Sequence, residues 1–198
     1  MRTDSELIAE SLNQSTGFGQ LYERHAKTIH RYAARRVGAT EADDVMSETF
    51  LIAYQRRANF SLESESALPW LYGIATNLLH KHRRLEAAAW KTLAATHEPA
   101  VAPDVAQAIG SRLDAQIAVA TLASAICRMP ARDRDALLLY AWGDLDYEGV
   151  AEALGIPIGT VRSRLNRARR VLRAANDRNP LPEEEVHDGR VDSASQGA

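Results

Sequence analysis

Cysteine, aromatic residues and long apolar runs are all scarce in this sequence. Cys127 is the only cysteine among 198 residues, so an intrachain disulfide is excluded. No apolar run approaches ~18 residues, and the N-terminus carries acids where a secretory signal is apolar, so we expect no membrane insertion. Aromatic residues make up 6% of the chain, and with abundant alanine this favours helices over sheets. We therefore expect an all-α, soluble, cytoplasmic protein.

Groups that would form an enzyme or metal centre are also missing. His80 and His82 form an HxH pair, but they point in different directions on a helix, and no cysteine or carboxylate cluster joins them. The sequence offers no nucleophile triad and no phosphate-binding loop. We expect no catalytic activity, no cofactor, no metal and no small-molecule substrate.

Residues 10–86 read as a first small helical domain. A helix over 17–37 ends at Gly38, and Thr40, three residues before Asp43, resembles a capping box for the next helix. That second helix has an apolar stripe at Val45, Thr49, Ile52 and Ala53. A third helix is expected over 67–84, with Pro69 in its first turn.

The rest of the chain divides into a linker, a second domain and a tail. Residues 87–111 are rich in alanine, with Pro99, Pro103 and Gly110, and we expect a flexible linker there. Residues 112–175 form the second small helical domain. Residues 176–198 contain six acids against two arginines, and we expect a disordered acidic tail. The tail explains why a chain with a basic helix has a net charge of -2.

The second domain contains the pattern of a helix-turn-helix. A helix opened by Pro130 ends at Gly143, Asp146 can cap the short helix YEGVAEAL, and Gly155 supplies a sharp turn. The next helix holds six arginines and no acid between residues 159 and 173. One interpretation is a solvated basic face without a ligand. The preceding turn and short helix favour DNA binding.

A helical wheel divides this basic helix into faces. Val161, Leu165, Ala168 and Leu172 form one stripe, which we expect to face the core. Ser163, Asn166 and Arg167 lie opposite, where they can contact base edges in a major groove. Thr160 lies nearer the edge, and the remaining arginines suit phosphates: Arg162, Arg164, Arg169 and Arg170.

The segment DYEGVAEALGIPIGTVRSRLNRARRVL resembles region 4 of bacterial sigma factors of the sigma-70 superfamily, in the extracytoplasmic-function (ECF) group. DDVMSETFLIAYQRR and PWLYGIATNLLHKHRR resemble region 2 of the same group. The resemblance implies a subunit that binds RNA polymerase core through its clamp and flap regions and directs it to promoter DNA. It also implies an anti-sigma factor as a partner.

The resemblance implies three sets of site residues. Region 4 would read the minus-35 element with the 159–173 helix. Region 2 would read and open the minus-10 element with the loop 59–68 and the next helix. The candidates there are Asn59, Phe60 and Asn77 for bases and Lys81, His82, Arg83 and Arg84 for the backbone. Core polymerase would bind Asp44, Glu48, Leu51 and Tyr54, although Leu51 and Tyr54 could instead pack inside the domain. Trp70 is expected in the core rather than as a stacking platform for bases.

Two departures from the family pattern stand out. The loop before Trp70 reads SLESESAL, and its acids Glu63 and Glu65 are unfavourable beside DNA. Gly149 stands where the family has glutamate, which removes half of a capping box. Two other functions remain open from the residues alone: a helix-turn-helix regulator that acts without polymerase, and a helical enzyme or interaction scaffold.

Overall fold

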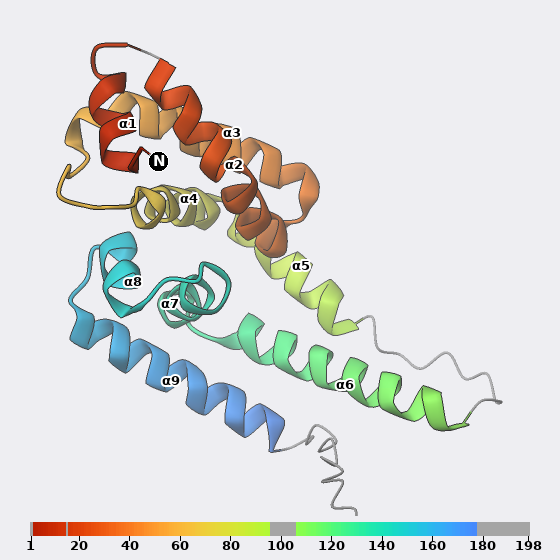
Figure 1. Ribbon diagram of the computed structural model, residues 1–198. Helices are drawn as coiled ribbons and strands as arrows, with labels where there is room; N and C mark the ends of the chain where they lie inside the picture. Colours follow the sequence, from red (N-terminus) through yellow and green to blue (C-terminus); the bar gives the residue numbers. More distant parts are fainter. Residues whose placement is uncertain (1, 15, 96–105, 178–198) are drawn as a thin grey trace, which may run out of the picture.

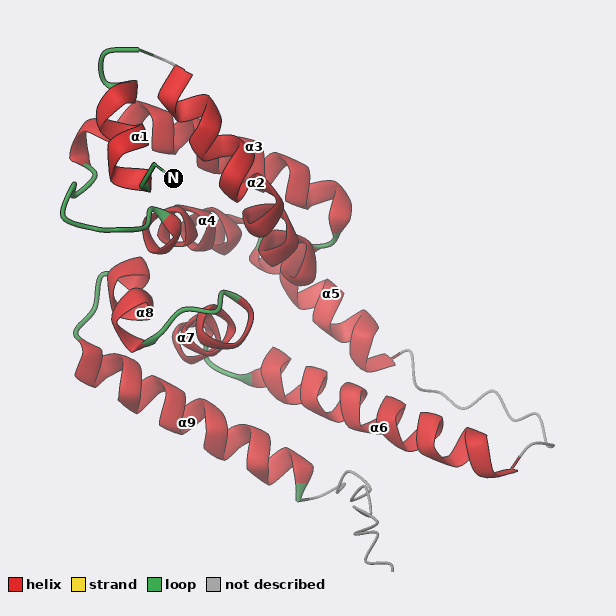
Figure 2. Cartoon of the chain, viewed as in Figure 1, coloured by secondary structure: helices red, strands yellow, loops and turns green. Residues whose placement is uncertain are grey.

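The computed structural model describes residues 2–14, 16–95 and 106–177, and every regular element in these ranges is helical (Figure 2). The N-terminal group comprises α1 (Asp4–Ser11), α2 (Thr16–Val37), α3 (Ala39–Arg56), η1 (Arg57–Asn59) and α4 (Leu68–Lys81). α5 (Arg83–Ala95) follows this group. The C-terminal group comprises α6 (Ala106–Arg128), α7 (Ala131–Trp142), α8 (Tyr147–Leu154) and α9 (Ile158–Asn176). The predicted all-α fold is confirmed. No helix in the described ranges is long and apolar enough to span a membrane.

The N-terminal group is built on apolar helix faces. Val45, Thr49 and Ala53 of α3 are buried and Ile52 partly so, which confirms the predicted stripe. Thr40 does not cap α3, because the helix already begins at Ala39, after Gly38 in a left-handed conformation with φ 94°.

α1 precedes the predicted domain of residues 10–86. Its sequence contains a detectable start signal, since Thr3 and Glu6 form a capping box in the structure. Leu7 and Ile8 on its inner face are fully buried. The helix therefore belongs to the N-terminal core.

The middle of the chain differs from the prediction in two ways. The expected helix over 67–84 is interrupted at His82, and a separate helix, α5, continues to Ala95 through the expected linker. Alanine is the strongest helix former, and Trp90 gives α5 a buried anchor by stacking on Trp142 of α7 with centroids 5.7 Å apart. α6 begins at Ala106, which also lies inside the expected linker. Residues 96–105, and the predicted tail from 178 onward, lie outside the described residues.

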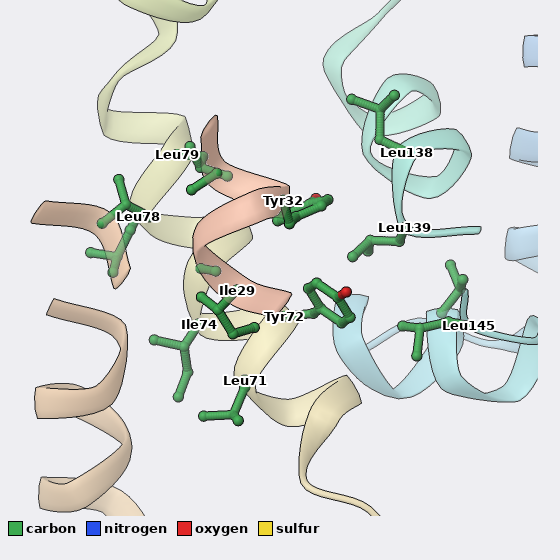
Figure 3. Packing of buried hydrophobic residues seen from close by; sticks show 14 of the residues in the cluster. Ile29, Tyr32, Leu71, Tyr72, Ile74, Leu78, Leu79, Leu138, Leu139 and Leu145 are labelled. Atoms are coloured by element: carbon green, nitrogen blue, oxygen red, sulfur yellow. The ribbon is translucent and has the colours of Figure 1, made fainter. Parts of the chain in front are cut away.

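The two helical groups pack directly on each other (Figure 1). Tyr32 of α2 and Tyr72 of α4 contact edge to face, 4.9 Å between centroids, and lie opposite Leu139 and Leu145 of the C-terminal group (Figure 3). At the α4–α8 contact, a Cβ atom added to Gly73 would lie only 2.5 Å from the carbonyl oxygen of Ala153. The predicted domains therefore share one continuous core in this structure.

Candidate nucleic-acid and polymerase interfaces

α9 has a buried face and a basic face, as predicted. Val161, Leu165 and Ala168 are fully buried against the C-terminal group, and Leu172 is partly buried. The predicted base-reading residues Ser163, Asn166 and Arg167 are exposed, as are Arg162 and Arg170. Thr160, Arg164 and Arg169 are partly buried. The outward face therefore combines arginines with short polar side chains, a composition suited to a DNA groove.

Local hydrogen bonds hold the helix-turn-helix. The Asp146 carboxylate accepts the N–H of Gly149 at 2.7 Å and so caps α8. Gly155 ends α8 with φ 60°, a left-handed conformation that favours glycine. A Cβ atom at Gly149 would lie 3.2 Å from the Asp146 carboxylate. Glycine thus fits this tight cap.

Two arginines of the basic face are held by neighbouring helices. Arg167 makes a two-point contact with Asp133 of α7, through Nε at 3.0 Å and Nη2 at 2.8 Å. The hydrogen bonds that Arg167 donates to the Asp133 carboxylate raise the pKa of Arg167. Arg169 bonds the hydroxyl of Tyr147 and lies over the ring of Tyr140, 5.6 Å from its centroid. Arg169 therefore braces α9 against α7 and α8, while Arg167 points outward with a carboxylate partner.

The candidate minus-10 residues differ in their exposure in this arrangement. Asn59 and Asn77 are exposed, whereas Phe60 is 7% exposed and packs on Trp70 with centroids 5.2 Å apart. As expected, Trp70 is a core-packing residue. Lys81 and Arg84 are exposed and His82 partly so. The side chain of Arg83 lies outside the described part of the chain.

A cavity of about 490 Å³ lies between the two helical groups. Asn77 of α4 and Arg164 of α9, which the sequence assigns to different promoter elements, both line it. Arg132 of α7 and His80 of α4 also line it. In this arrangement Asn77, a candidate minus-10 residue of α4, therefore faces the C-terminal group.

Beside the cavity, a buried ionic network connects the two groups. Arg36 of α2 has no exposed surface and donates to Glu86 of α5 and to Asp135 of α7, each at 2.7 Å. Burial alone would lower the pKa of Arg36, but the surrounding Tyr32, Asp135 and Glu86 raise it above its ordinary value. Buried charges require partners of this kind.

Asp135 extends the network to α4. Its second carboxylate oxygen lies 2.7 Å from Nε2 of His80. Burial alone would raise the pKa of Asp135, but the hydrogen bond from His80 and the charge of Arg36 lower it. Within the described ranges, no group of His, Cys, Asp and Glu side chains is arranged to hold a metal ion. No local sequence pattern indicates this network, because its members lie far apart in the chain.

Three of the four candidate polymerase contacts lie exposed on α3. Asp44 and Glu48 are exposed, and Leu51 is 56% exposed, so Leu51 is not a core residue of this domain. Tyr54 is partly buried between the ring of Phe18, 5.1 Å away, and the guanidinium of Arg57, 3.9 Å away. The acids and Leu51 thus form a strip with one apolar side chain.

Comparisons with known proteins agree with this architecture. The family "Sigma-70 region 2" matches residues 21–89, and "Sigma-70, region 4" matches residues 120–172. The ECF RNA polymerase sigma factor SigL of Mycobacterium tuberculosis is 30% identical over 154 residues, covering 77% of this chain and 85% of SigL.

Two solved structures share the fold. The structure of CnrH bound to the cytosolic domain of CnrY has a TM-score of 0.60 at 24% identity, covering 89% of this chain and 98% of that one. The sigma factor RpoE of Bartonella quintana, bound to the anti-sigma factor NepR, has a TM-score of 0.55 at 22% identity, covering 81% and 96%. The sequence match to SigL, with regions 2 and 4 in order along one chain, shows that this protein belongs to the ECF group of RNA polymerase sigma factors.

Proposed function

We propose that this sigma factor binds core polymerase through α3 and reads a promoter at two places, with α9 upstream and with the 59–68 loop and α4 downstream. The observation that carries the proposal is the exposed face of α9, where Asn166 and Arg167 project from a helix fixed by the domain core. Arginine pairs with guanine and asparagine with adenine through two hydrogen bonds each. The chain supplies recognition, and the polymerase supplies the chemistry.

Upstream reading requires Arg167 to exchange partners. Its two hydrogen bonds to Asp133 have the geometry that it would use toward a guanine edge. Asp133 is 4% exposed and stays on α7, so it can hold the guanidinium in an extended position before DNA arrives. The exchange leaves the Asp133 carboxylate without this partner, so the contact to guanine has to offset that loss.

Reading both elements requires the helical groups to separate. Elements centred about 25 base pairs apart lie roughly 85 Å apart on B-DNA, at about 3.4 Å per base pair. In the structure, Asn77 and Arg164 line a single cavity, and α8 contacts α4. The packed arrangement is therefore that of the free chain, and the promoter-bound chain is open.

A protein partner that holds the closed chain is part of the proposal. RpoE of Bartonella quintana, which shares the fold, was solved with an anti-sigma factor. A partner that bound across both helical groups would keep Asn77 away from DNA. We place the protein in the cytoplasm, with the polymerase that it serves.

Run-off transcription on genomic DNA, with start sites mapped, tests the proposal. Purified core supplemented with this chain should initiate specifically at sites that share two sequence elements. A variant with Asn166 replaced by alanine is the control; this side chain is exposed, so the variant should fold and bind core but initiate less specifically. If wild type never initiates specifically, yet shifts duplex DNA in gels without core, the chain is a polymerase-independent regulator instead.

A further inference from the structure

α1 lies outside the matched region 2 family, which begins at residue 21, yet it contacts the loop assigned to the minus-10 element. In Figure 1 this helix lies beside the chain that connects α3 to α4. The loop carries Glu63 and Glu65, the acids that set this chain apart from its family. The contacts between α1 and the loop therefore bear on how this protein reads DNA.

Asp4 at the first turn of α1 is the centre of these contacts. It is 3% exposed. One carboxylate oxygen accepts the backbone N–H of Ala67 at 2.8 Å and lies 2.8 Å from Nε2 of His25 and 3.4 Å from the Ser66 hydroxyl. The other oxygen accepts Arg24 at 2.5 Å.

The pKa of Asp4 shows that these partners favour the ionised carboxylate. Burial alone would raise the pKa, but the hydrogen bonds from His25 and Ala67, the charge of His25 and the hydrogen bond from Arg24 lower it to about 2. Because an ionised carboxylate only accepts hydrogen bonds, it suits a site where all the neighbours are donors. Asparagine has nearly the same shape, but it offers one acceptor oxygen instead of two.

A second contact fixes the loop further from α4. The hydroxyl of Ser5 donates to the carbonyl oxygen of Ser64. Ser64 also closes a turn with Ser61, through its N–H at 3.1 Å. Residues 64 and 67 are thus attached to α1 at the backbone, while the side chains of Glu65 between them and of Glu63 just before them are exposed. The loop presents its acids in a direction set by α1.

We infer that Asp4 is a positioning residue for minus-10 recognition, acting through the backbone of the 64–67 segment without touching DNA. The inference rests on the proposed assignment of this loop to the minus-10 element. It predicts that weakening the α1–loop contact changes base preference downstream and leaves upstream binding and core binding unchanged.

A purely structural role for α1 is the competing explanation, because Leu7 and Ile8 also anchor the helix. Glu6→Ala separates the two. Glu6 accepts the N–H of Thr3 at 2.9 Å in the capping box and is exposed. Its loss weakens the start of α1 without removing the Asp4 contact to the loop.

The experiment compares full-length wild type, Asp4→Asn and Glu6→Ala in two measurements. Hydrogen exchange at Ala67 reports the contact itself. Run-off transcription with core on templates with a randomised minus-10 element reports base preference. We expect Asp4→Asn to speed exchange at Ala67 about tenfold and to flatten the downstream preference by a similar factor, the effect of one lost charge-assisted hydrogen bond. Glu6→Ala should change either quantity by less than about twofold.

Two results would overturn the inference. One is unchanged exchange at Ala67 in Asp4→Asn, which would mean that α1 does not hold the loop. The other is a result in which wild type initiates specifically, but Asp4→Asn leaves the downstream base preference unchanged or both variants alter it equally. That second result would leave the proposed function standing. Failure of wild type to initiate would count against the function itself, and the exchange rates would still decide the contact.

Discussion

Replacing Gly73 with alanine tests whether the two helical groups pack as closely as the structure shows. The new methyl group would lie 2.5 Å from the Ala153 carbonyl oxygen and 3.5 Å from its Cα atom. Restoring ordinary contact moves α8 away from α4 by about 1 Å, and overpacking of this kind costs about 1–3 kcal/mol. Alanine also stabilises the interior of α4 by about 1 kcal/mol relative to glycine. The variant should therefore have a more stable α4 and weaker packing between the groups.

Small-angle scattering and hydrogen exchange measure the two effects separately. We expect a larger radius of gyration and faster exchange in α8, with α4 at least as protected as in wild type. Gly19→Ala is the matched control, since Gly19 lies within α2 and an added Cβ would meet nothing within 4 Å. It should gain the same helix stability and leave the dimensions of the chain unchanged.

Opening should also be visible in function. If the packed arrangement keeps α4 from DNA, Gly73→Ala should bind core and promoter more tightly than wild type, because less free energy is needed to separate the groups. A variant as compact as wild type, with α8 equally protected and stability raised as in Gly19→Ala, would refute the close packing. An open variant with unchanged promoter affinity would refute the claim that closure limits binding.

Three further predictions concern individual side chains. Arg167→Ala should relax base preference at one upstream base pair by about 1–3 kcal/mol. Arg164→Ala should instead weaken binding to every duplex and lower the slope of log affinity against log salt concentration by about one. DNA-binding titrations at several salt concentrations measure both effects, and the same effect in both variants would contradict the division of roles. Leu51→Ala should leave the melting temperature nearly unchanged because Leu51 is 56% exposed, yet lower core affinity by about 1 kcal/mol; unchanged affinity in a fluorescence titration would place the docking surface elsewhere. Because the pKa of Asp4 is lowered to about 2, its ionised carboxylate stabilises the folded state by about 2 kcal/mol above pH about 4. This stabilisation is lost as the pH falls toward 2. In urea unfolding, Asp4→Ala should have a lower free energy of unfolding than wild type at neutral pH, and this free energy should fall less steeply between pH about 4 and about 2. An equally steep fall in the two proteins would exclude this contribution.

Local chemistry made the helix-turn-helix predictable. The Asp146 cap, the Gly155 turn and the buried stripe of α9 each depend on residues within a few positions of one another. The same holds for the buried face of α3, which follows from its apolar spacing. The position of Leu51 stayed open from the sequence, and the structure places it on the surface. α1 was equally accessible from its capping box.

Packing between the groups was not predictable from local pattern. Arg36 follows another arginine on a helix, which is the usual appearance of a solvated charge, and its partners Glu86 and Asp135 lie 50 and 99 residues away in the chain. The segment around Trp90 looked like a linker because its alanines carry no amphipathic pattern. Its helix depends on a tryptophan in a different domain, Trp142. The structural role of such residues can be assigned only when the tertiary contacts are known.

The buried Arg36 network also has a consequence for reversibility. When the groups part, Arg36, Glu86 and Asp135 return to water, and their hydration offsets much of the lost attraction. An interface of the same size built only from leucine and methionine would gain no such hydration when it opened. It would also expose an apolar surface that is prone to aggregate with other chains. Substituting apolar residues at these three positions and at Arg134, which also donates to Glu86, should therefore give a protein that is harder to unfold and whose groups separate more slowly. For a chain whose helical groups are proposed to separate on a promoter, buried charges make the interface easier to open than an apolar interface would be.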